Sequence, residues 1–336
     1  MIIVRTPFRV SFFGGGTDYP DWYNEHGGVV LTTSIDKYGY ITCRYLPPFF
    51  DYKFRIRYSV REETETIDQI KHPSVRECLK FLKIDRGVEV QHNADLPAMS
   101  GLGSSSSFSV GLLQALYALR GKMITRRQLA KDAIHVEQNL IGESVGSQDQ
   151  TIASFGGFNK VTFNKQQGFE VEPLIMNANK LAELQKHLML FFVGFPRRAS
   201  VLAKEQIENI PNNTSSLKRL MQMTEHAINA LADDATSLDE FGKLLDENWK
   251  IKRTLTQKIT NSDVDQAYST ALSAGALGGK LLGAGGGGFM LIFSKPELRE
   301  KIKEKLKPLL YVPFRFENLG SQIIFYNQDE CVNDVL

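Results

Sequence analysis

Short runs rich in β-branched and aromatic side chains fill the first hundred residues of the chain, and Gly, Pro or Asp residues separate them. Such runs are typical of β-strands, because these side chains pack well on a pleated, half-buried surface. The pattern therefore predicts a β-rich N-terminal region, with strands at 2–13, 28–35, 38–46 and 87–94.

Two helices are predicted after these strands. Residues 104–121 place apolar side chains at helical spacing and end in a glycine, which commonly stops a helix. Residues 125–141 begin with Thr125 and Gln128 at the spacing of a capping box and run to Gly142. The predicted apolar stripes are Phe108, Leu112, Leu116 and Leu119 in the first helix, and Leu129, Ala133, Val136 and Leu140 in the second.

The second half of the chain alternates helical and strand-like patterns. A buried strand over 188–195 is followed by helices 215–233, 238–255, 263–275 and 296–309 and by strands 288–293 and 320–327. This alternation predicts an α+β architecture with helices against one face of a sheet. We expect two domains, residues 1–187 and 188–336, which fits 336 residues at roughly 150 per domain.

The overall composition narrows the classes of function. A hydrophobic fraction of 42% and a charged fraction of 23% are ordinary for a globular protein with a core. Forty Lys and Arg against 38 Asp and Glu leave a net charge of +2, which indicates neither a nucleic-acid nor a membrane partner. Any anion-binding site must therefore be local.

The cysteines and the apolar runs bear on location. Cys43, Cys78 and Cys331 are far apart and lack metal-ligand spacing, which is typical of reduced thiols. Arg5 and Arg9 interrupt the N-terminal apolar run, so it does not fit a signal peptide, and no other run approaches a membrane span. We expect a cytoplasmic protein, and the sequence leaves open whether it is a monomer or a homodimer.

A glycine- and serine-rich loop, PAMSGLGSSSS at 97–107, lies between a predicted strand and a predicted helix. Strand, glycine-rich loop and helix N-terminus together present backbone N–H groups to a phosphate, and the helix dipole adds attraction. The serines could cap the helix or offer a hydroxyl to a metal ion. An ordinary small-residue turn with a serine cap is an equally good interpretation of this loop alone.

Three other phosphate or nucleophile patterns are excluded. No Walker A loop occurs, and the nearest stretch has Leu281 where Ser or Thr is required. GAGGGG at 283–288 leads into a strand instead of a helix, which argues against a dinucleotide fingerprint. GESVG at 142–146 follows a helix, whereas the hydrolase nucleophile Ser of such a motif must follow a strand.

Acidic and glycine-rich positions elsewhere are candidates for the remaining chemistry. Glu137 lies at the edge of an apolar stripe and could hold Mg²⁺, and Asp149 could deprotonate an attacking hydroxyl. Taken alone, a carboxylate at such a position is more often a solvated charge or a helix cap. The stretch GGGTD at 14–18 could bring backbone close to a ligand and let Asp18 accept hydroxyl hydrogens, or could form a turn. Arg9 could keep a nearby carboxylate ionised.

Taken together, these stretches resemble the GHMP kinase superfamily. PFRVSFFGGGTDY matches its first motif, PAMSGLGSSSS its phosphate loop and KLLGAGGGG at 280–288 its third motif, in the family's order along nearly the whole chain. The resemblance implies an N-terminal domain like ribosomal protein S5 domain 2, a ferredoxin-like C-terminal domain, and an enzyme that uses ATP and Mg²⁺.

The resemblance also implies roles for individual residues. Asp149 would be the catalytic carboxylate and Arg9 its neighbour, while Ser105 and Glu137 would hold Mg²⁺. The ATP phosphates would be bound by Gly101, Leu102, Gly103, Ser104, Ser105 and Ser106. The substrate would be bound by Gly14, Gly15, Gly16, Thr17, Asp18, Arg197, Arg198, Gly285 and Gly286.

One departure from the galactokinase pattern bears on the substrate. Galactokinases have G-E-H-T-D where this chain has GGGTD at 14–18, so acidic and imidazole sugar contacts are absent. The GGGTDYP form resembles the branch with heptose 7-phosphate 1-kinases and fucokinase domains, which implies phosphorylation of the C1 hydroxyl of a sugar phosphate. Arg197 and Arg198 could clamp a distal phosphate, and the run with Lys250, Lys252 and Arg253 is a second candidate.

Two alternatives to a heptose phosphate kinase stay open at this point. The first is a fucokinase- or galactokinase-like enzyme that acts on an unphosphorylated sugar. The second is a sugar and ATP sensor of the same fold that has no catalytic activity, although sensing alone does not require Asp149.

Overall fold

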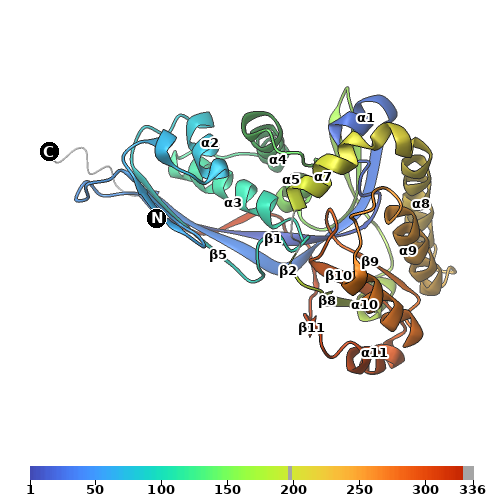
Figure 1. The fold of residues 1–336 in the computed structure, drawn as a ribbon. Helices are drawn as coiled ribbons and strands as arrows, with labels where there is room; N and C mark the ends of the chain where they lie inside the picture. The colour runs from blue at the N-terminus through green and yellow to red at the C-terminus, as the bar shows by residue number, and fades with distance from the viewer. Residues whose placement is uncertain (196–198, 328–336) are drawn as a thin grey trace.

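A computed structural model of the chain describes residues 1–195 and 199–327 and contains two β-sheets (Figure 1). The strands of the larger sheet are β1 (Ile2–Phe13), β2 (Gly28–Tyr45), β3 (Phe54–Arg57), β4 (Arg61–Thr64), β5 (Val88–Ala94), β6 (Phe158–Asn164), β7 (Gly168–Pro173), β12 (Phe316–Glu317) and β13 (Gln322–Tyr326). Its main path runs β13-β1-β2-β5-β3-β4, while β6 and β12 also pair with β2, and β7 pairs with β6.

The smaller sheet is antiparallel and lies toward one end of the larger one (Figure 1). Its strands are β8 (Leu188–Phe192), β9 (Gly278–Leu281), β10 (Phe289–Phe293) and β11 (Leu310–Tyr311). They lie in the order β11-β8-β10-β9, so the fourth strand is beside the first and the third beside the second. This order is that of a ferredoxin-like sheet.

Helices cover one face of the larger sheet and surround the smaller one (Figure 1). The α-helices are α1 (Pro20–His26), α2 (Pro73–Phe81), α3 (Ser104–Leu119), α4 (Arg126–His135), α5 (Gln148–Phe155), α6 (Ala178–His187), α7 (Ala199–Glu208), α8 (Thr214–Ala232), α9 (Leu238–Lys252), α10 (Ser262–Ser273) and α11 (Arg299–Lys305). Helix α3 packs on β1 and β2, and buried apolar residues of all three form one core. The α+β class is therefore confirmed.

The long strand β2 differs from the sequence prediction. Two strands were expected, at 28–35 and 38–46, but the structure has one continuous strand over Gly28–Tyr45. It pairs with β1 over residues 31–43, and a register shift at Pro7/Phe8 of β1 accommodates the polar residues between the two predicted strands. A bulge of this kind lets a ladder continue past an unpaired residue, so local polarity did not mark a strand end.

The helix predicted over 125–141 is present but changes its winding. Thr125 caps α4 through a hydrogen bond from the Gln128 N–H, and a π-helical segment, Val136–Ile141, follows α4 directly. The wider π-turn rotates the later side chains relative to the predicted stripe. Leu140 is consequently 39% exposed, whereas Glu137 is fully buried. This rotation points a carboxylate into the protein.

The end of the chain returns to the first sheet. We predicted that residues 188–336 form the second domain, and β8 does begin the smaller sheet at Leu188. However, β12 and β13 pair with β2 and β1 of the larger sheet, because their backbone groups complete its edge. The stretch 316–326 therefore belongs to the larger sheet. Within the described residues, no helix combines the length and apolarity needed to cross a bilayer.

Candidate active site

Two glycine-rich loops lie in direct backbone contact at the centre of the site. A Cβ on Gly101 would lie 2.5 Å from the carbonyl oxygen of Leu282, and Gly101 has a φ of +82°, which favours glycine. The Phe289 N–H donates a hydrogen bond to the Ser100 carbonyl at 3.1 Å. The first loop (101–106) and the third-motif loop (282–288) therefore support each other, and only glycine permits this approach.

The first loop leads straight into the N-terminus of α3. The N-cap is Gly103 with a φ of +75°, and no side chain among the described residues caps this helix. The Ser107 hydroxyl instead donates to the Pro7 carbonyl at 2.6 Å. The turn is therefore not capped by serine, and the first N–H groups of a 16-residue helix stay available for an anion.

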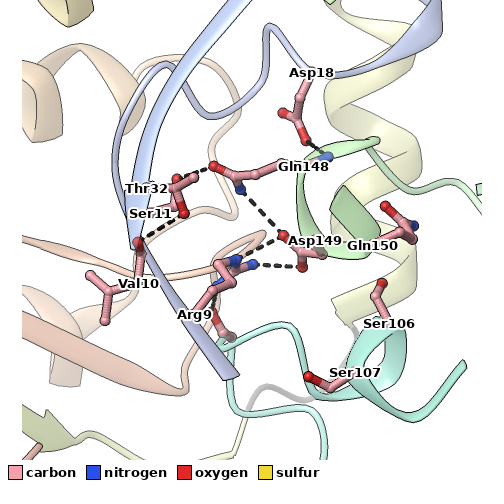
Figure 2. Close-up of polar contacts among 12 residues, drawn as sticks. Arg9, Val10, Ser11, Asp18, Thr32, Ser106, Ser107, Gln148, Asp149 and Gln150 are labelled. Carbon is pink, nitrogen blue, oxygen red and sulfur yellow. Dashed lines mark hydrogen bonds and ion pairs between the residues drawn. The ribbon is translucent and has the colours of Figure 1, made fainter. Parts of the chain in front are cut away.

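Arg9 and Asp149 form the central ion pair of the site (Figure 2). The guanidinium of Arg9 donates from Nε to Asp149 Oδ1 and from Nη2 to Asp149 Oδ2, each at 2.7 Å, and from Nη1 to the Gly101 carbonyl at 2.6 Å. Asp149 lies in the first turn of α5, and Arg9 lies on β1. This bidentate pair fixes the carboxylate beside the phosphate loop.

One oxygen of Asp149 has room for a further partner. Oδ1 accepts from Arg9 and, at 3.2 Å, from Gln148 Nε2, whereas Oδ2 accepts from Arg9 alone among the described residues. A Cβ on Gly103 would lie 3.1 Å from Oδ2, so the missing side chain leaves space there. The Asp149 side chain is 24% exposed. Oδ2 can therefore accept a proton from a ligand placed against the loop.

Gln148 connects Asp149 to a second carboxylate, Asp18 (Figure 2). Its Oε1 accepts from the Ser11 hydroxyl at 2.8 Å, and its backbone N–H lies 3.4 Å from Asp18 Oδ2. Asp18 Oδ1 also accepts from the Gly16 N–H at 3.0 Å. Burial, and then the charge of Asp149, raise the pKa of Asp18. The two carboxylates therefore face one region of the site.

Glu137 is held beneath the start of α3. Its Oε2 accepts from the Ser106 hydroxyl at 2.8 Å and from the Gln150 amide, while its Oε1 is buried without a hydrogen-bond partner among the described residues. Burial raises the pKa of Glu137 to about 7. The sequence predicts that Ser105 and Glu137 hold Mg²⁺; Ser105 is exposed in the first turn of α3, and it is the neighbouring Ser106 that donates to Glu137. The phase of α3 turns Ser106 inward.

The first glycine motif divides into structural and open positions. A Cβ on Gly14 would lie 1.9 Å from the Val29 carbonyl oxygen, and the fully buried Thr17 hydroxyl donates to the Gly14 and Val29 carbonyls. These two residues hold the turn together. Gly15 has no atom closer than 3.8 Å to its Cβ position. Gly16 lines a small hollow with Tyr19, Gln206, Ile210, Asn213, Leu217 and Leu255.

The third motif contacts the segment after α9. The Gly286 N–H donates to the Ile259 carbonyl at 2.9 Å, and a Cβ on Gly285 would lie 2.8 Å from the Ile259 backbone. These contacts show a role in packing for both predicted substrate-binding glycines. GAGGGG leads into β10, which agrees with the exclusion of a dinucleotide fingerprint.

The predicted cationic residues differ in their burial and in their partners. Arg197 and Arg198 lie outside the described residues. Lys250 is exposed and pairs with Asp246 at 2.7 Å, and Arg253 lies 3.7 Å from Asp265. Lys252 alone of this run is buried and turns toward the site, where it donates to the Gly283 carbonyl.

Sequence reasoning missed three contributors: Gln148, Gln150 and Gly146. A Cβ on Gly146 would lie 1.9 Å from Asp18 Oδ2, so Gly146 makes room for that carboxylate. The two glutamines flank Asp149 in the sequence. Gln148 donates to Asp149 from its side chain and to Asp18 from its backbone N–H, and the Gln150 amide donates to Glu137. Their position next to a candidate catalytic residue was the available signal.

Comparison with known proteins identifies the family. The sequence profile described as GHMP kinases N terminal domain matches residues 73–157, and the profile described as GHMP kinases C terminal matches residues 227–311. A D-glycero-α-D-manno-heptose 7-phosphate kinase of Campylobacter jejuni is 28% identical over 320 residues, which are 91% of this chain and 93% of that relative. A bifunctional fucokinase/GDP-fucose pyrophosphorylase of Arabidopsis thaliana is 27% identical over 333 residues, which are 90% of this chain and 31% of that protein.

A solved structure supports the same assignment of the fold. The crystal structure of a D-glycero-D-manno-heptose 1-phosphate kinase from Bacteroides thetaiotaomicron has a TM-score of 0.79 at 22% identity, over 98% of this chain and 100% of that one. The predicted fold class is confirmed by this likeness together with the two matched profiles. The chain belongs to the GHMP kinases.

Proposed function

We propose that this enzyme transfers the γ-phosphoryl group of ATP to the C1 hydroxyl of D-glycero-D-manno-heptose 7-phosphate, giving the 1,7-bisphosphate, on the route to a nucleotide-activated heptose for surface polysaccharide. The chain is an ATP-dependent sugar kinase, as its family and relatives show. The choice of sugar is supported by similarity to a heptose 7-phosphate kinase and by GGGTD at 14–18. The Arg9–Asp149 ion pair beside the phosphate loop is the observation that carries the reaction.

The proposed transfer uses Asp149 as general base. The acceptor oxygen forms a bond to the γ-phosphorus while the bond from that phosphorus to the leaving oxygen breaks, and its electron pair stays on ADP. The proton of the acceptor hydroxyl passes to Asp149 Oδ2, the oxygen with the single described partner. Because phosphoryl transfer requires mainly positioning and charge neutralisation, the fixed fork of Arg9 and the open N-terminus of α3 suit it.

The residues around Glu137 fit a bound Mg²⁺. The unpartnered, buried Oε1 of Glu137 and the neighbouring Ser106 hydroxyl are hard oxygen ligands, and Mg²⁺ is typically held by one or two such groups with phosphate oxygens. No cluster of three or more acidic, His or Cys residues for a metal occurs in the part of the chain that the structure describes. Bound Mg²⁺ would neutralise phosphate charge; Glu137 and Ser106 would hold it.

The substrate assignment can be tested with a panel of sugars. We expect ADP release with Mg-ATP and heptose 7-phosphate, and slower or no release with mannose 6-phosphate, fucose, galactose or mevalonate. The names of the two heptose kinases place the phosphate at different positions, so phosphorus NMR must locate the new group. A new anomeric phosphate signal supports the proposal. Turnover on a free sugar alone contradicts it.

A free 6-deoxy sugar such as fucose is the second candidate substrate. A bifunctional fucokinase/GDP-fucose pyrophosphorylase is among the relatives, and the GGGTDYP form at 14–20 resembles fucokinase domains. The sugar panel above separates the two candidates directly.

Arg197 and Arg198, which lie outside the described residues, give a second test of the phosphate clamp. If they bind the distal phosphate, Arg197→Ala or Arg198→Ala should raise KM for heptose 7-phosphate at least about 10-fold, because a charge-assisted contact is lost. The KM for ATP should stay within about 3-fold. Unchanged sugar KM values in both variants would remove the clamp from the proposal.

Gly146→Ala should weaken sugar binding selectively. The added Cβ would lie 1.9 Å from Asp18 Oδ2 and displace the carboxylate that we propose binds sugar hydroxyls. We expect the sugar KM to rise about 10-fold and the ATP KM to change less than about 3-fold. Ser144→Ala in the same loop should keep full activity. Equal loss of affinity for both substrates in Gly146→Ala would argue against a sugar-binding role for Asp18.

A further inference from the structure

Lys252, the last residue of α9, carries a buried ammonium group next to the candidate active site. The residue is 6% exposed, and its Nζ donates a hydrogen bond to the Gly283 carbonyl at 2.6 Å. Across residues 1–195 and 199–327, this carbonyl is its one acceptor, and no carboxylate lies within ion-pair distance. An ammonium group has three N–H donors, so two of them have no protein acceptor there.

The partner of Lys252 places it at the junction of the glycine-rich loops. A Cβ on Gly283 would lie 2.6 Å from the Gly101 Cα, and the Gly101 carbonyl accepts from Arg9. Lys252 and Arg9 thus bind carbonyls of two touching glycines. The ammonium group lies at the end of the site where the phosphate loop meets Asp149.

The charges around Lys252 leave room for an anion. The charged groups that act on the Lys252 ammonium are Arg9 on β1, Asp18 before α1 and Asp149 on α5. Lys252 also acts on Lys280, the buried lysine of β9. Lys280 donates to the Phe12 carbonyl at 2.9 Å. Burial lowers the pKa of Lys280 well below its usual range, and Asp149 is already paired with Arg9. No carboxylate of the described residues therefore lies at ion-pair distance from the Lys252 ammonium group. A buried charge without a counter-charge is unfavourable, and an incoming phosphoryl group would supply one.

We propose that Lys252 contacts the phosphoryl group as it passes from ATP to the acceptor, as a further catalytic residue of this enzyme. The inference rests on the proposed use of Asp149 as base, but it does not depend on which sugar is the acceptor. Lys252 exchanges no atoms; its free N–H groups donate to phosphoryl oxygens while the bond to ADP breaks and the bond to the acceptor oxygen forms. Because Lys252 lies beside Asp149, we assign it to the phosphoryl group that is transferred and not to the distal phosphate of the sugar.

Steady-state kinetics of three variants test the proposal, with whichever sugar the enzyme turns over. Lys252→Met should lower kcat about 100-fold, the scale for loss of one electrostatic donor, with both KM values within about 3-fold. Lys252→Arg should recover part of kcat because it restores the charge. Lys243→Met is the matched control, because Lys243 lies on the same helix, is 66% exposed and faces solvent. It should behave like the wild-type enzyme.

A binding measurement provides a readout that needs no turnover. Aluminium fluoride with ADP mimics the transferred phosphoryl group, so wild-type enzyme should bind ADP more tightly when Mg²⁺, aluminium and fluoride are present. Lys252→Met should keep its affinity for ADP alone and lose most of this enhancement. An enhancement that is unchanged in Lys252→Met would overturn the proposal.

The pH profile separates a catalytic from a merely structural role. Burial, and then the charge of Arg9, lower the pKa of Lys252 to about 8, against the opposing charges of Asp18 and Asp149. The charged form is present below that pH, so kcat/KM of the wild-type enzyme should fall as pH rises through about 8. Lys252→Arg should move this limb upward. The inference would be contradicted if this limb stayed at the same pH in Lys252→Arg. It would also be contradicted if Lys252→Arg did not restore kcat and the loss of kcat followed a loss of thermal stability.

The outcome of these tests is distinct from that of the substrate assignment. Loss of the fluoride enhancement in Lys252→Met supports the role of Lys252 even if heptose 7-phosphate is not phosphorylated. Turnover of heptose 7-phosphate at the wild-type rate by Lys252→Met overturns the role of Lys252 and leaves the substrate assignment intact.

Discussion

Asp149→Asn should lower kcat about 1,000-fold while the affinity for ATP changes less than about 3-fold, since a positioned general base contributes roughly 10²–10⁴-fold. The amide cannot accept the proton of the acceptor hydroxyl, and it also replaces one of the two oxygens that Arg9 binds at 2.7 Å. The phosphate loop also has contacts that do not involve this carboxylate, because the Phe289 N–H donates to the Ser100 carbonyl and Gly101 packs closely on Leu282. Steady-state kinetics and calorimetric binding of a non-hydrolysable ATP analogue measure the two quantities.

Asp132→Asn is the matched control for that substitution. Asp132 lies on α4, is 6% exposed and accepts from the Tyr117 hydroxyl and the Gln128 amide, each at 2.7 Å. The same chemical change there should lower stability and leave kcat largely intact. If Asp149→Asn loses nucleotide binding in proportion to turnover, Asp149 is a structural residue and the proposed base must be sought elsewhere.

Glu137→Gln should lower activity and raise stability at alkaline pH, two effects of opposite sign. Removal of the charge takes away a proposed Mg²⁺ ligand, so we expect kcat to fall about 100-fold at saturating Mg-ATP. The amide keeps an oxygen for the Ser106 hydroxyl, which donates to Glu137 at 2.8 Å. The fold should therefore persist.

The stability effect follows from proton linkage. Burial raises the pKa of Glu137 from 4.5 to about 7, so between these values the folded protein binds more protons than the unfolded chain. The free energy of unfolding consequently falls as pH rises through that window, by about 3 kcal/mol at most, at 1.36 kcal/mol per pKa unit. Glutamine has no such penalty, so the variant should gain stability relative to wild type between pH 5 and pH 8.

Urea unfolding at pH 5 and pH 8, in the presence of a chelator, measures this difference. The same titration predicts that wild-type kcat/KM rises with pH through about 7, as the ionised carboxylate becomes available for Mg²⁺. A stability difference between Glu137→Gln and wild type that does not change with pH would show that Glu137 titrates normally. An unchanged kcat would remove it from the proposed metal site.

Much of the fold could be predicted from local patterns, and the exceptions have physical causes. Strand β1 and helix α3 follow from apolar periodicity, because each buries one face against a neighbour. The two predicted strands at 28–35 and 38–46 are one strand because the partner β1 continues past the polar residues. Pairing with another strand is a tertiary property, which local polarity does not reveal.

The candidate site shows the same division. The glycine-rich loops, Asp149 and Arg9 were identified from their residue types and order, but their contact spans 140 positions of sequence. The sequence did not show which serine contacts Glu137; Ser106 does so, because the phase of a helix at its first turn depends on what packs around it. A shift of one residue turns a side chain by about 100° around the helix axis.

The sequence by itself determined the chemistry that is available: three glycine-containing motifs in order, a candidate carboxylate base, and the family to which the chain belongs. Only the tertiary structure decided which groups meet and how they are charged. Lys250 and Lys252 are alike in sequence, yet one is exposed and paired with Asp246 while the other is buried between two glycine-rich loops. Burial and Coulomb interactions depend on distances between residues far apart in the chain, and those distances exist only once the chain has folded.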